Sequence, residues 1–98
     1  MTMTLAIEIA TVLLEIGAVS FDPKNPVTFK SGIKSPVYTD NRRLPFYPNS
    51  WRVVIDGFQT VIQEKNLELD VLAGIEAAGI PHSAALGYAM QKPSVFVR

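Results

Sequence analysis

The feature that most constrains this chain is a cluster of prolines between positions 20 and 48. Five of the seven prolines lie there: Pro23, Pro26, Pro36, Pro45 and Pro48. Because proline fixes φ and lacks a backbone donor, this density is expected to exclude a helix of any length in the segment. The residues between the prolines instead predict two short strands, Val27–Lys30 and Pro36–Thr39, joined through residues 31–34.

Helical patterns lie on both sides of this proline-rich segment. Apolar residues recur at helical spacing over Leu5–Ile16, and Gly17 can adopt the left-handed conformation that ends a helix. The outward face of this helix carries few charges, which favours packing on two sides, as at a subunit interface. A second helix is predicted to begin at the N-cap residues Asn49 and Ser50 and to run to about Lys65. Its expected buried stripe is Val53, Val54, Phe58, Val61 and Ile62.

The last part of the chain has the pattern of a strand, a loop, a helix and a second strand. Asp70–Ile75 is a short apolar run, typical of a strand that is buried on both faces. A helix is predicted from about His82 to Met90, with Pro81 in its first turn, and Ser94–Val97 is the second strand. This order predicts an α/β fold with a parallel, helix-covered sheet. Because two strands would leave long unpaired edges, we expect the functional protein to continue past Arg98.

Charge and composition limit the classes of ligand and of protein that fit this sequence. The formal net charge is zero, but Lys24–Arg52 holds six basic residues and one acidic residue, whereas the rest holds three basic and eight acidic. Clustered positive charge indicates an anionic ligand, although a solvated basic loop explains it equally well. Basic and aromatic residues do not alternate as in nucleic-acid-binding segments. No apolar run approaches the ~20 residues of a membrane span, and no signal peptide is visible. The chain has no cysteine, so we expect a cytoplasmic protein without disulfides.

The loop after the first buried strand is the candidate ligand-binding element. Ligands of open α/β sheets bind at the carboxyl ends of strands, and small residues let backbone amides approach an anion. Gly74 and Gly79 are spaced like the glycines of a P-loop, but Ile80 and Pro81 stand where that motif requires Lys and Ser or Thr. The residues alone therefore leave a phosphate-binding loop and a plain turn equally open.

Two polar residues of this region, and three aromatic residues elsewhere, have more than one interpretation. Glu76 could bind a water of a Mg²⁺ ion, pair with a basic group or point into solvent. His82 begins a helix, where the dipole disfavours its charged form, so a structural role is expected rather than that of a catalytic base. Phe21, Trp51 and Phe58 are expected to lie in the core rather than to stack on a ligand.

Three segments together resemble the orotate phosphoribosyltransferase family, and they agree with it in order and spacing. Phe29–Arg42 contains the pattern S-G-x-K-S-P, which in that family holds the orotate ring and reaches the phosphoribosyl donor. Ala73–Ala84 is similar to the family's strand–loop–helix A-G-x-x-x-A-G-I-P-H, and Lys92–Arg98 resembles the strand that ends in a pyrophosphate-binding arginine. The resemblance spans nearly the whole chain and corresponds to the amino-terminal half of the family.

The resemblance implies a type I phosphoribosyltransferase fold, with an N-terminal hood over a parallel sheet flanked by helices, incomplete in this chain. Residues 1–48 would be the hood segment and residues 49–98 the first part of the core. The implied reaction transfers the 5-phosphoribosyl group from phosphoribosyl pyrophosphate to orotate, which gives orotidine 5′-phosphate and pyrophosphate in pyrimidine biosynthesis. The family requires Mg²⁺ and forms homodimers. Its catalytic loop would follow Arg98, so this fragment alone would hold no catalytic residue and would be inactive.

The resemblance also assigns binding residues. The substrate-binding residues would be Lys30, Ser31, Gly32, Tyr38 and Thr39. The pyrophosphate-binding residues would be Glu76, Ala77, Ala78, Gly79 and Arg98, and no side chain would bind the metal. Of the substrate-binding residues, Tyr38 can stack on the orotate ring and Thr39 cannot. The roles of Lys34, Arg42 and His82 stay open.

Two alternative functions remain. One is a phosphoribosyltransferase-fold protein with another specificity or a regulatory role. The other is a non-enzymatic module whose basic segment binds an anion or an acidic partner.

Overall fold

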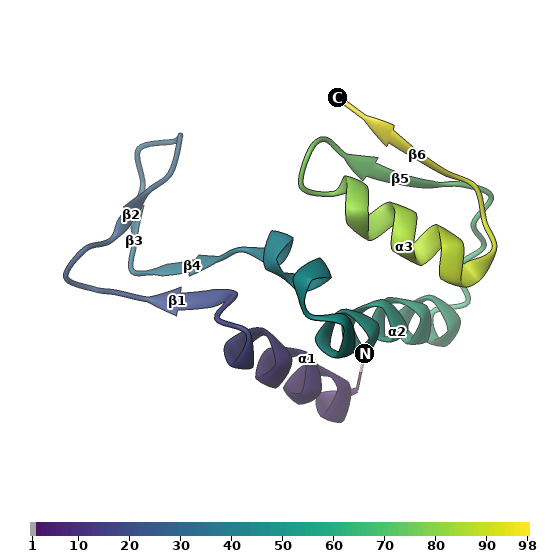
Figure 1. The fold of residues 1–98 in the computed structure, drawn as a ribbon, viewed down its shortest axis with the longest axis horizontal. Helices are drawn as coiled ribbons and strands as arrows, with labels where there is room; N and C mark the ends of the chain where they lie inside the picture. The colour runs from purple at the N-terminus through teal and green to yellow at the C-terminus, as the bar shows by residue number, and fades with distance from the viewer. Residues whose placement is uncertain (1) are drawn as a thin grey trace.

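The computed structural model describes residues 2–98, which form three α-helices, one 3₁₀ helix and three two-stranded sheets (Figure 1). Helix α1 (Met3–Glu15) begins where the Thr2 hydroxyl accepts a hydrogen bond from the Leu5 amide at 3.1 Å. It ends before Gly17, whose φ is +72°, so the predicted helix and its glycine stop are confirmed. None of the helices within residues 2–98 is long and apolar enough to cross a lipid bilayer.

Helix α2 (Pro48–Glu64) begins earlier than predicted. Its N-cap is Tyr47, so the prediction that Asn49 and Ser50 cap this helix was wrong. Pro48 explains the earlier start, because a proline at the first helical position has a suitable φ and needs no acceptor for the amide hydrogen that it lacks.

Four short strands occupy the proline-rich segment. Strand β1 (Val19–Phe21) pairs antiparallel with β4 (Val37–Thr39), and β2 (Val27–Thr28) pairs antiparallel with β3 (Lys34–Ser35). The prediction of a single hairpin between Val27–Lys30 and Pro36–Thr39 was therefore wrong in its pairing. Pro36, between β3 and β4, cannot donate to a ladder.

The carbonyl of Pro36 instead accepts from the Asp22 amide at 2.7 Å, which brings the chain back beside β1. The hydroxyl of Ser35 also donates to the Val37 carbonyl at 2.8 Å and accepts from the Val37 amide at 3.1 Å. These bonds turn the chain between β3 and β4, so the two strands belong to different ribbons.

A 3₁₀ helix, η1 (Asn41–Phe46), lies between β4 and α2 and contains Pro45. The expectation that the prolines exclude a helix of any length was wrong here. Short 3₁₀ turns with i→i+3 hydrogen bonds are common as connectors between other elements. At the start of η1 the Asp40 carboxylate accepts a hydrogen bond from the Arg42 amide at 3.1 Å. At its end the Tyr47 amide donates to the Leu44 carbonyl at 2.9 Å.

The main core joins α1, η1 and α2, so the first 48 residues share one hydrophobic cluster with the helix that follows them. Its buried members are Val12, Ile16, Ala18, Leu44 and Val54. Leu44 is only 1 % exposed and lies at the centre of the cluster. Arg43 links η1 to the end of α1 by a hydrogen bond, in which its Nη1 donates to the Gly17 carbonyl at 3.0 Å.

Two aromatic residues that were expected in the core are exposed. Phe21 is 69 % exposed because it lies on the two-stranded β1–β4 ribbon, and Phe58 is 46 % exposed. The buried face of α2 is centred on Val54, Ile55 and Gly57, so Phe58 lies at its margin. Trp51 is half-buried and packs against the main core, as predicted.

The predicted α/β unit is confirmed. Strands β5 (Leu72–Ile75) and β6 (Ser94–Val97) are parallel, and α3 (Ile80–Met90) connects them with a proline in its first turn. Helix α3 begins at Ile80, two residues before the predicted start. The expectation of strands buried on both faces was wrong for this chain, since α3 lies along one face and Ile75, on the other, is 70 % exposed (Figure 1).

The molecule is drawn out rather than spherical. Its radius of gyration is 14.9 Å, whereas a compact domain of about 100 residues has roughly 13 Å. The strand ribbons account for the difference, because they extend away from the β5–α3–β6 unit (Figure 1).

Candidate functional site

The first predicted binding segment lies at the tip of the β2–β3 hairpin. The tip closes through the Phe29 amide, which donates to the Ile33 carbonyl, and the Gly32 amide, which donates to the Phe29 carbonyl, both at 2.9 Å. Gly32 has φ +88°, and a Cβ there would meet nothing within 4 Å. Glycine is therefore favoured at this position by the backbone angle rather than by close packing. Lys30 and Ser31 are exposed beside it.

The other predicted substrate residues lie on β4. Tyr38 pairs with Ser20 of β1 and Thr39 with Val19. Because successive side chains of a strand point to opposite faces, Tyr38 and Thr39 face opposite sides of the ribbon. A ligand on one side of this ribbon would therefore meet the side chain of one of these residues and the backbone of the other.

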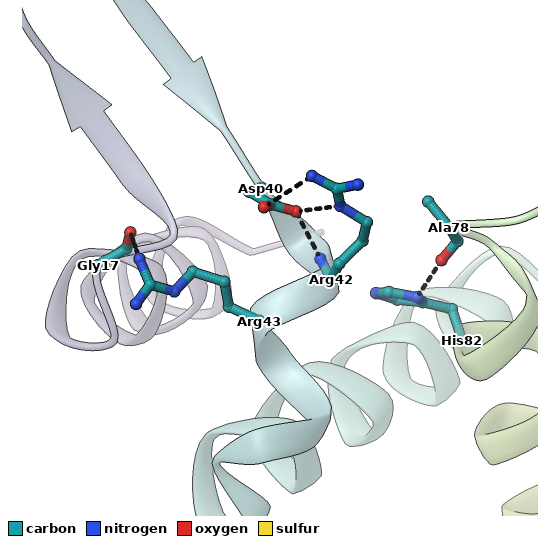
Figure 2. A network of polar contacts seen from close by, with 6 residues as sticks. All are labelled: Gly17, Asp40, Arg42, Arg43, Ala78 and His82. Atoms are coloured by element: carbon teal, nitrogen blue, oxygen red, sulfur yellow. Dashed lines mark hydrogen bonds and ion pairs between the residues drawn. The ribbon is translucent and has the colours of Figure 1, made fainter.

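Asp40 and Arg42 form a bidentate ion pair where β4 meets η1 (Figure 2). Arg42 Nε donates to Asp40 Oδ1 at 2.7 Å, and Arg42 Nη2 donates to Asp40 Oδ2 at 3.0 Å. The hydrogen bond from Arg42 is the main reason that the pKa of Asp40 lies below its ordinary value, and the same bond raises the pKa of Arg42. Two of the three guanidinium nitrogens of Arg42 thus bind the carboxylate that caps η1.

The second predicted segment is the loop between β5 and α3, and its two glycines are required by close packing. A Cβ on Gly74 would overlap the Gly79 carbonyl oxygen and Ser83 Oγ. A Cβ on Gly79 would lie 2.7 Å from the Ile75 amide nitrogen. The end of the strand and the start of the helix therefore touch through backbone atoms. The peptide bond between Glu76 and Ala77 is cis.

The carbonyls of this loop are held by α3. The Ile80 amide donates to the Ala77 carbonyl at 3.3 Å, and the Ser83 amide donates to the Gly79 carbonyl at 3.0 Å. Between them, the Ala78 carbonyl accepts from His82 Nδ1 at 3.2 Å (Figure 2).

The carbonyls of Ala77, Ala78 and Gly79 have hydrogen-bond partners, but within residues 2–98 two amides of the loop do not. In the part of the chain that the structure describes, the amides of Ala77 and Ala78 donate to no carbonyl. Two consecutive free amides thus lie at the carboxyl end of a parallel strand and beside a helix N-terminus, an arrangement that suits an anion.

Glu76 and Arg98 end the two parallel strands at the same edge of the sheet. The Glu76 amide continues the ladder by donating to the Val97 carbonyl at 2.8 Å. Arg98 Nε lies 3.7 Å from Glu76 Oε2, and both side chains are exposed. The structure therefore brings the five residues predicted to bind pyrophosphate to one edge: Glu76, Ala77, Ala78, Gly79 and Arg98.

The two predicted binding segments do not meet in this chain. In Figure 1 the hairpin tip lies at upper left and the loop between β5 and α3 lies apart from it to the right, with β4 and η1 below both. A side-chain metal site is also lacking within residues 2–98, where no group of three or more His, Cys, Asp or Glu could hold an ion.

The contribution of His82 to the loop is not apparent from the sequence. Its ring packs edge-to-face on Trp51, with ring centroids 4.8 Å apart, while Nδ1 holds the Ala78 carbonyl. The only signal in the sequence is a side-chain donor four positions after Ala78, and that spacing alone does not distinguish this bond from a solvent-facing histidine.

No protein-family model matches the chain. It is 47 % identical over 96 residues to an orotate phosphoribosyltransferase of Streptococcus pyogenes (serotype M12, strain MGAS2096), an alignment that covers 98 % of this chain and 46 % of that protein. The chain thus spans about half the length of the curated relatives it matches.

The chain is also similar to solved structures with related names. The chain matches Leishmania donovani UMP synthase with a TM-score of 0.81 and 32 % identity, over 93 % of this chain and 19 % of that one. It matches the orotate phosphoribosyltransferase from Aeropyrum pernix with a TM-score of 0.79 and 31 % identity, over 92 % of this chain and 52 % of that one. In sequence and in fold the chain is similar to orotate phosphoribosyltransferases, about half of whose length it spans.

Proposed function

We propose that this chain is part of an orotate phosphoribosyltransferase and that residues 76–79 with Arg98 form its pyrophosphate-binding edge. One observation carries the proposal beyond sequence similarity. The loop carbonyls are turned toward α3, so two free amides and an exposed guanidinium lie at the carboxyl edge of the parallel strands. Such an edge can bind a diphosphate through backbone donors and one flexible cation.

The reaction needs this edge for charge stabilisation. Orotate N1 forms a bond to C1′ of the phosphoribosyl donor, and the bond from C1′ to the pyrophosphate oxygen breaks. Negative charge grows on the departing pyrophosphate. The amides of Ala77 and Ala78 and the guanidinium of Arg98 would stabilise that charge, helped by the positive end of α3. Since N1 is the nucleophile, no nucleophilic side chain is required.

Arg98 would exchange partners when the diphosphate binds. Its contact with Glu76 spans 3.7 Å between exposed groups, and such a pair contributes little stability. The guanidinium can therefore turn from the carboxylate to a phosphate, a bond that is charge-assisted and stronger. In the unliganded protein, Glu76 keeps Arg98 near the loop.

Mg²⁺ belongs to the proposal through the family resemblance. The described residues do not form a side-chain site for it, since Glu76 is the only carboxylate of the loop and faces Arg98. The ion would arrive with the diphosphate, where it neutralises phosphate charge. A cytoplasmic homodimer is likewise part of the proposal on the strength of the family alone.

Orotate and the phosphoribosyl donor are proposed to contact Lys30, Ser31, Gly32, Tyr38 and Thr39. This part of the proposal stands on the S-G-x-K-S-P resemblance, because the hairpin tip does not approach the loop in this chain (Figure 1). The exposed Lys30 and the open backbone around Gly32 leave the tip free to receive a ligand.

The test uses the full-length protein that contains this chain. Arg98→Gln should raise KM for phosphoribosyl pyrophosphate by roughly tenfold or more, the size expected for a hydrogen bond to a charged group, and leave KM for orotate nearly unchanged. Lys92→Gln is the matched control, because Lys92 is exposed at the other end of β6. Both constants are measured by steady-state release of pyrophosphate.

Three outcomes would contradict the proposal. The first is a wild-type protein that releases no pyrophosphate in the presence of orotate. The second is an equal effect of the Arg98 and Lys92 substitutions. The third is turnover by the isolated 98-residue chain, which would show that it is more than part of an enzyme.

A further inference from the structure

We propose that His82 is a positioning residue for the pyrophosphate loop, and that its Nδ1–H fixes the Ala78 carbonyl so that the loop keeps its amides available to the ligand. The inference rests on the proposed function, because the amides of Ala77 and Ala78 matter through the diphosphate they would receive. His82 itself is not proposed to touch the substrate.

The hydrogen bonds of the loop show why this residue is needed. The carbonyls of Ala77 and Gly79 accept from backbone amides of α3, whereas the Ala78 carbonyl accepts from a side chain. The peptide between Ala78 and Gly79 is held on its other side by the Gly79 amide, which donates to the Ile75 carbonyl at 2.8 Å. Loss of His82 would leave the Ala78 carbonyl without a donor in the loop.

A free Ala78 carbonyl would harm anion binding in two ways. Its oxygen carries partial negative charge and could turn toward the position that the diphosphate occupies. Rotation of this peptide would also change ψ of Ala78 and loosen the direction of the neighbouring Ala78 amide. The Ala77–Ala78 peptide that carries this amide is held by a longer bond, 3.3 Å from the Ile80 amide to the Ala77 carbonyl. The bond from His82 therefore holds the peptide that directly follows the most weakly held one.

The surroundings of the ring fix its tautomer. A carbonyl oxygen only accepts, so Nδ1 carries the hydrogen and the neutral ring has a lone pair at Nε2. Nε2 is buried and finds no hydrogen-bond partner among residues 2–98. Trp51 of α2 packs against the ring edge-to-face, which limits its rotation. The histidine thus links α2 to the loop through its contact with Trp51 and its bond to Ala78.

Three substitutions separate the donor from the ring. His82→Asn keeps a nitrogen donor the same number of bonds from the backbone as Nδ1. His82→Gln moves the donor one bond further, to the place of Nε2. His82→Phe keeps an aromatic ring against Trp51 and removes the donor. If the bond to Ala78 matters, the asparagine variant alone should retain function.

The experiment measures pyrophosphate affinity by titration calorimetry and both KM values in the full-length protein. His82→Phe and His82→Gln should weaken pyrophosphate binding and raise KM for phosphoribosyl pyrophosphate roughly three- to tenfold, as for one lost hydrogen bond. KM for orotate should change less than about twofold, and His82→Asn should stay within about twofold of wild type for all three values. Nitrogen NMR of ¹⁵N-histidine protein, assigned by the signal lost in His82→Asn, should show the Nδ1–H tautomer.

The outcomes distinguish this inference from the proposed function. Wild-type turnover with unchanged pyrophosphate affinity in His82→Phe overturns the inference alone. Equal losses in the Asn and Gln variants, or an Nε2–H tautomer, also overturn the inference. If the Phe variant does not fold, these two outcomes decide the matter. A wild-type protein that neither turns over orotate nor binds pyrophosphate refutes the proposed function, whichever tautomer His82 shows.

Discussion

Two glycines that lack a positive φ, Gly79 and Gly57, differ in what an added methyl group would meet. At Gly79 the nearest atoms are backbone atoms of Ile75, at 2.7 and 2.8 Å, which cannot move without opening the loop. At Gly57 the nearest atom is the end of the Ile9 side chain, at 3.1 Å. We expect Gly79→Ala to lower the free energy of unfolding by about 2–3 kcal/mol.

Gly57→Ala should be nearly neutral, because alanine gains up to about 1 kcal/mol in a helix and offsets the crowding of Ile9. Urea unfolding of the two variants provides the measurement. A Gly79→Ala protein as stable as Gly57→Ala would show that the loop does not pack on Ile75 as closely as the structure indicates. The spacing of Gly74 and Gly79 after a strand is a local signal, but on the residues alone it left a phosphate-binding loop and a plain turn equally open.

Side-chain partners were harder to predict at this scale. The role of Arg42 stayed open in the sequence because its bidentate bond to Asp40 depends on the course of β4 into η1. The histidine ring that bonds to Ala78 also packs on Trp51, which lies on another helix. Neither arrangement has a signature in the residue order, whereas the contact of Glu76 with Arg98 was among the possibilities stated for Glu76.

At the scale of an element, η1 depends on a charged cap. The Asp40 carboxylate accepts from the Arg42 amide and from the Arg42 guanidinium, and its pKa lies below the ordinary value of 3.8, chiefly because of the hydrogen bond from the Arg42 side chain. A carboxyl whose folded pKa is depressed adds stability above its unfolded pKa. This stability is lost as the pH falls through the folded pKa.

We therefore expect a loss of stability below about pH 4 that Asp40→Asn makes smaller, because asparagine can still cap η1 but does not ionise. Arg42→Met should reduce the loss to a similar degree by removing the partner. The measurement is the free energy of unfolding in urea from pH 5 to pH 2 for the three proteins. Identical pH profiles for wild type and Asp40→Asn would contradict this assignment.

Some helices and strands could be predicted from local sequence patterns, and others could not. Strand β5, helix α3 and strand β6 follow one another closely, so hydrophobic period and Pro81 were enough to predict the unit. The pairing of β1 with β4 joins segments that are separated by β2 and β3, and Val19–Phe21 is too short for a clear alternation. That pairing continues in the hydrogen bond from the Asp22 amide to the Pro36 carbonyl, a long-range contact that the sequence does not show.

At the scale of the whole molecule, the parallel sheet has one face covered by α3 and one face open. Gly74 is buried against α3, so the alternating residues Ala73 and Ile75 face the other way, and their partners Val95 and Val97 share that face. Parallel strands are usually buried on both faces. The open face is therefore apolar surface of a kind that promotes association.

We expect the isolated 98-residue chain to bind a hydrophobic dye and to associate as its concentration rises, and Val97→Lys to reduce both. Val37→Lys is the matched control, because Val37 is 44 % exposed and Val97 is 45 % exposed, but Val37 lies on the narrow β1–β4 ribbon. Dye fluorescence and sedimentation velocity give the measurements. Equal effects of the two lysines would assign the association to general hydrophobicity. An effect of Val97→Lys alone would locate it on the open sheet face, next to the edge where residues 76–79 and Arg98 meet.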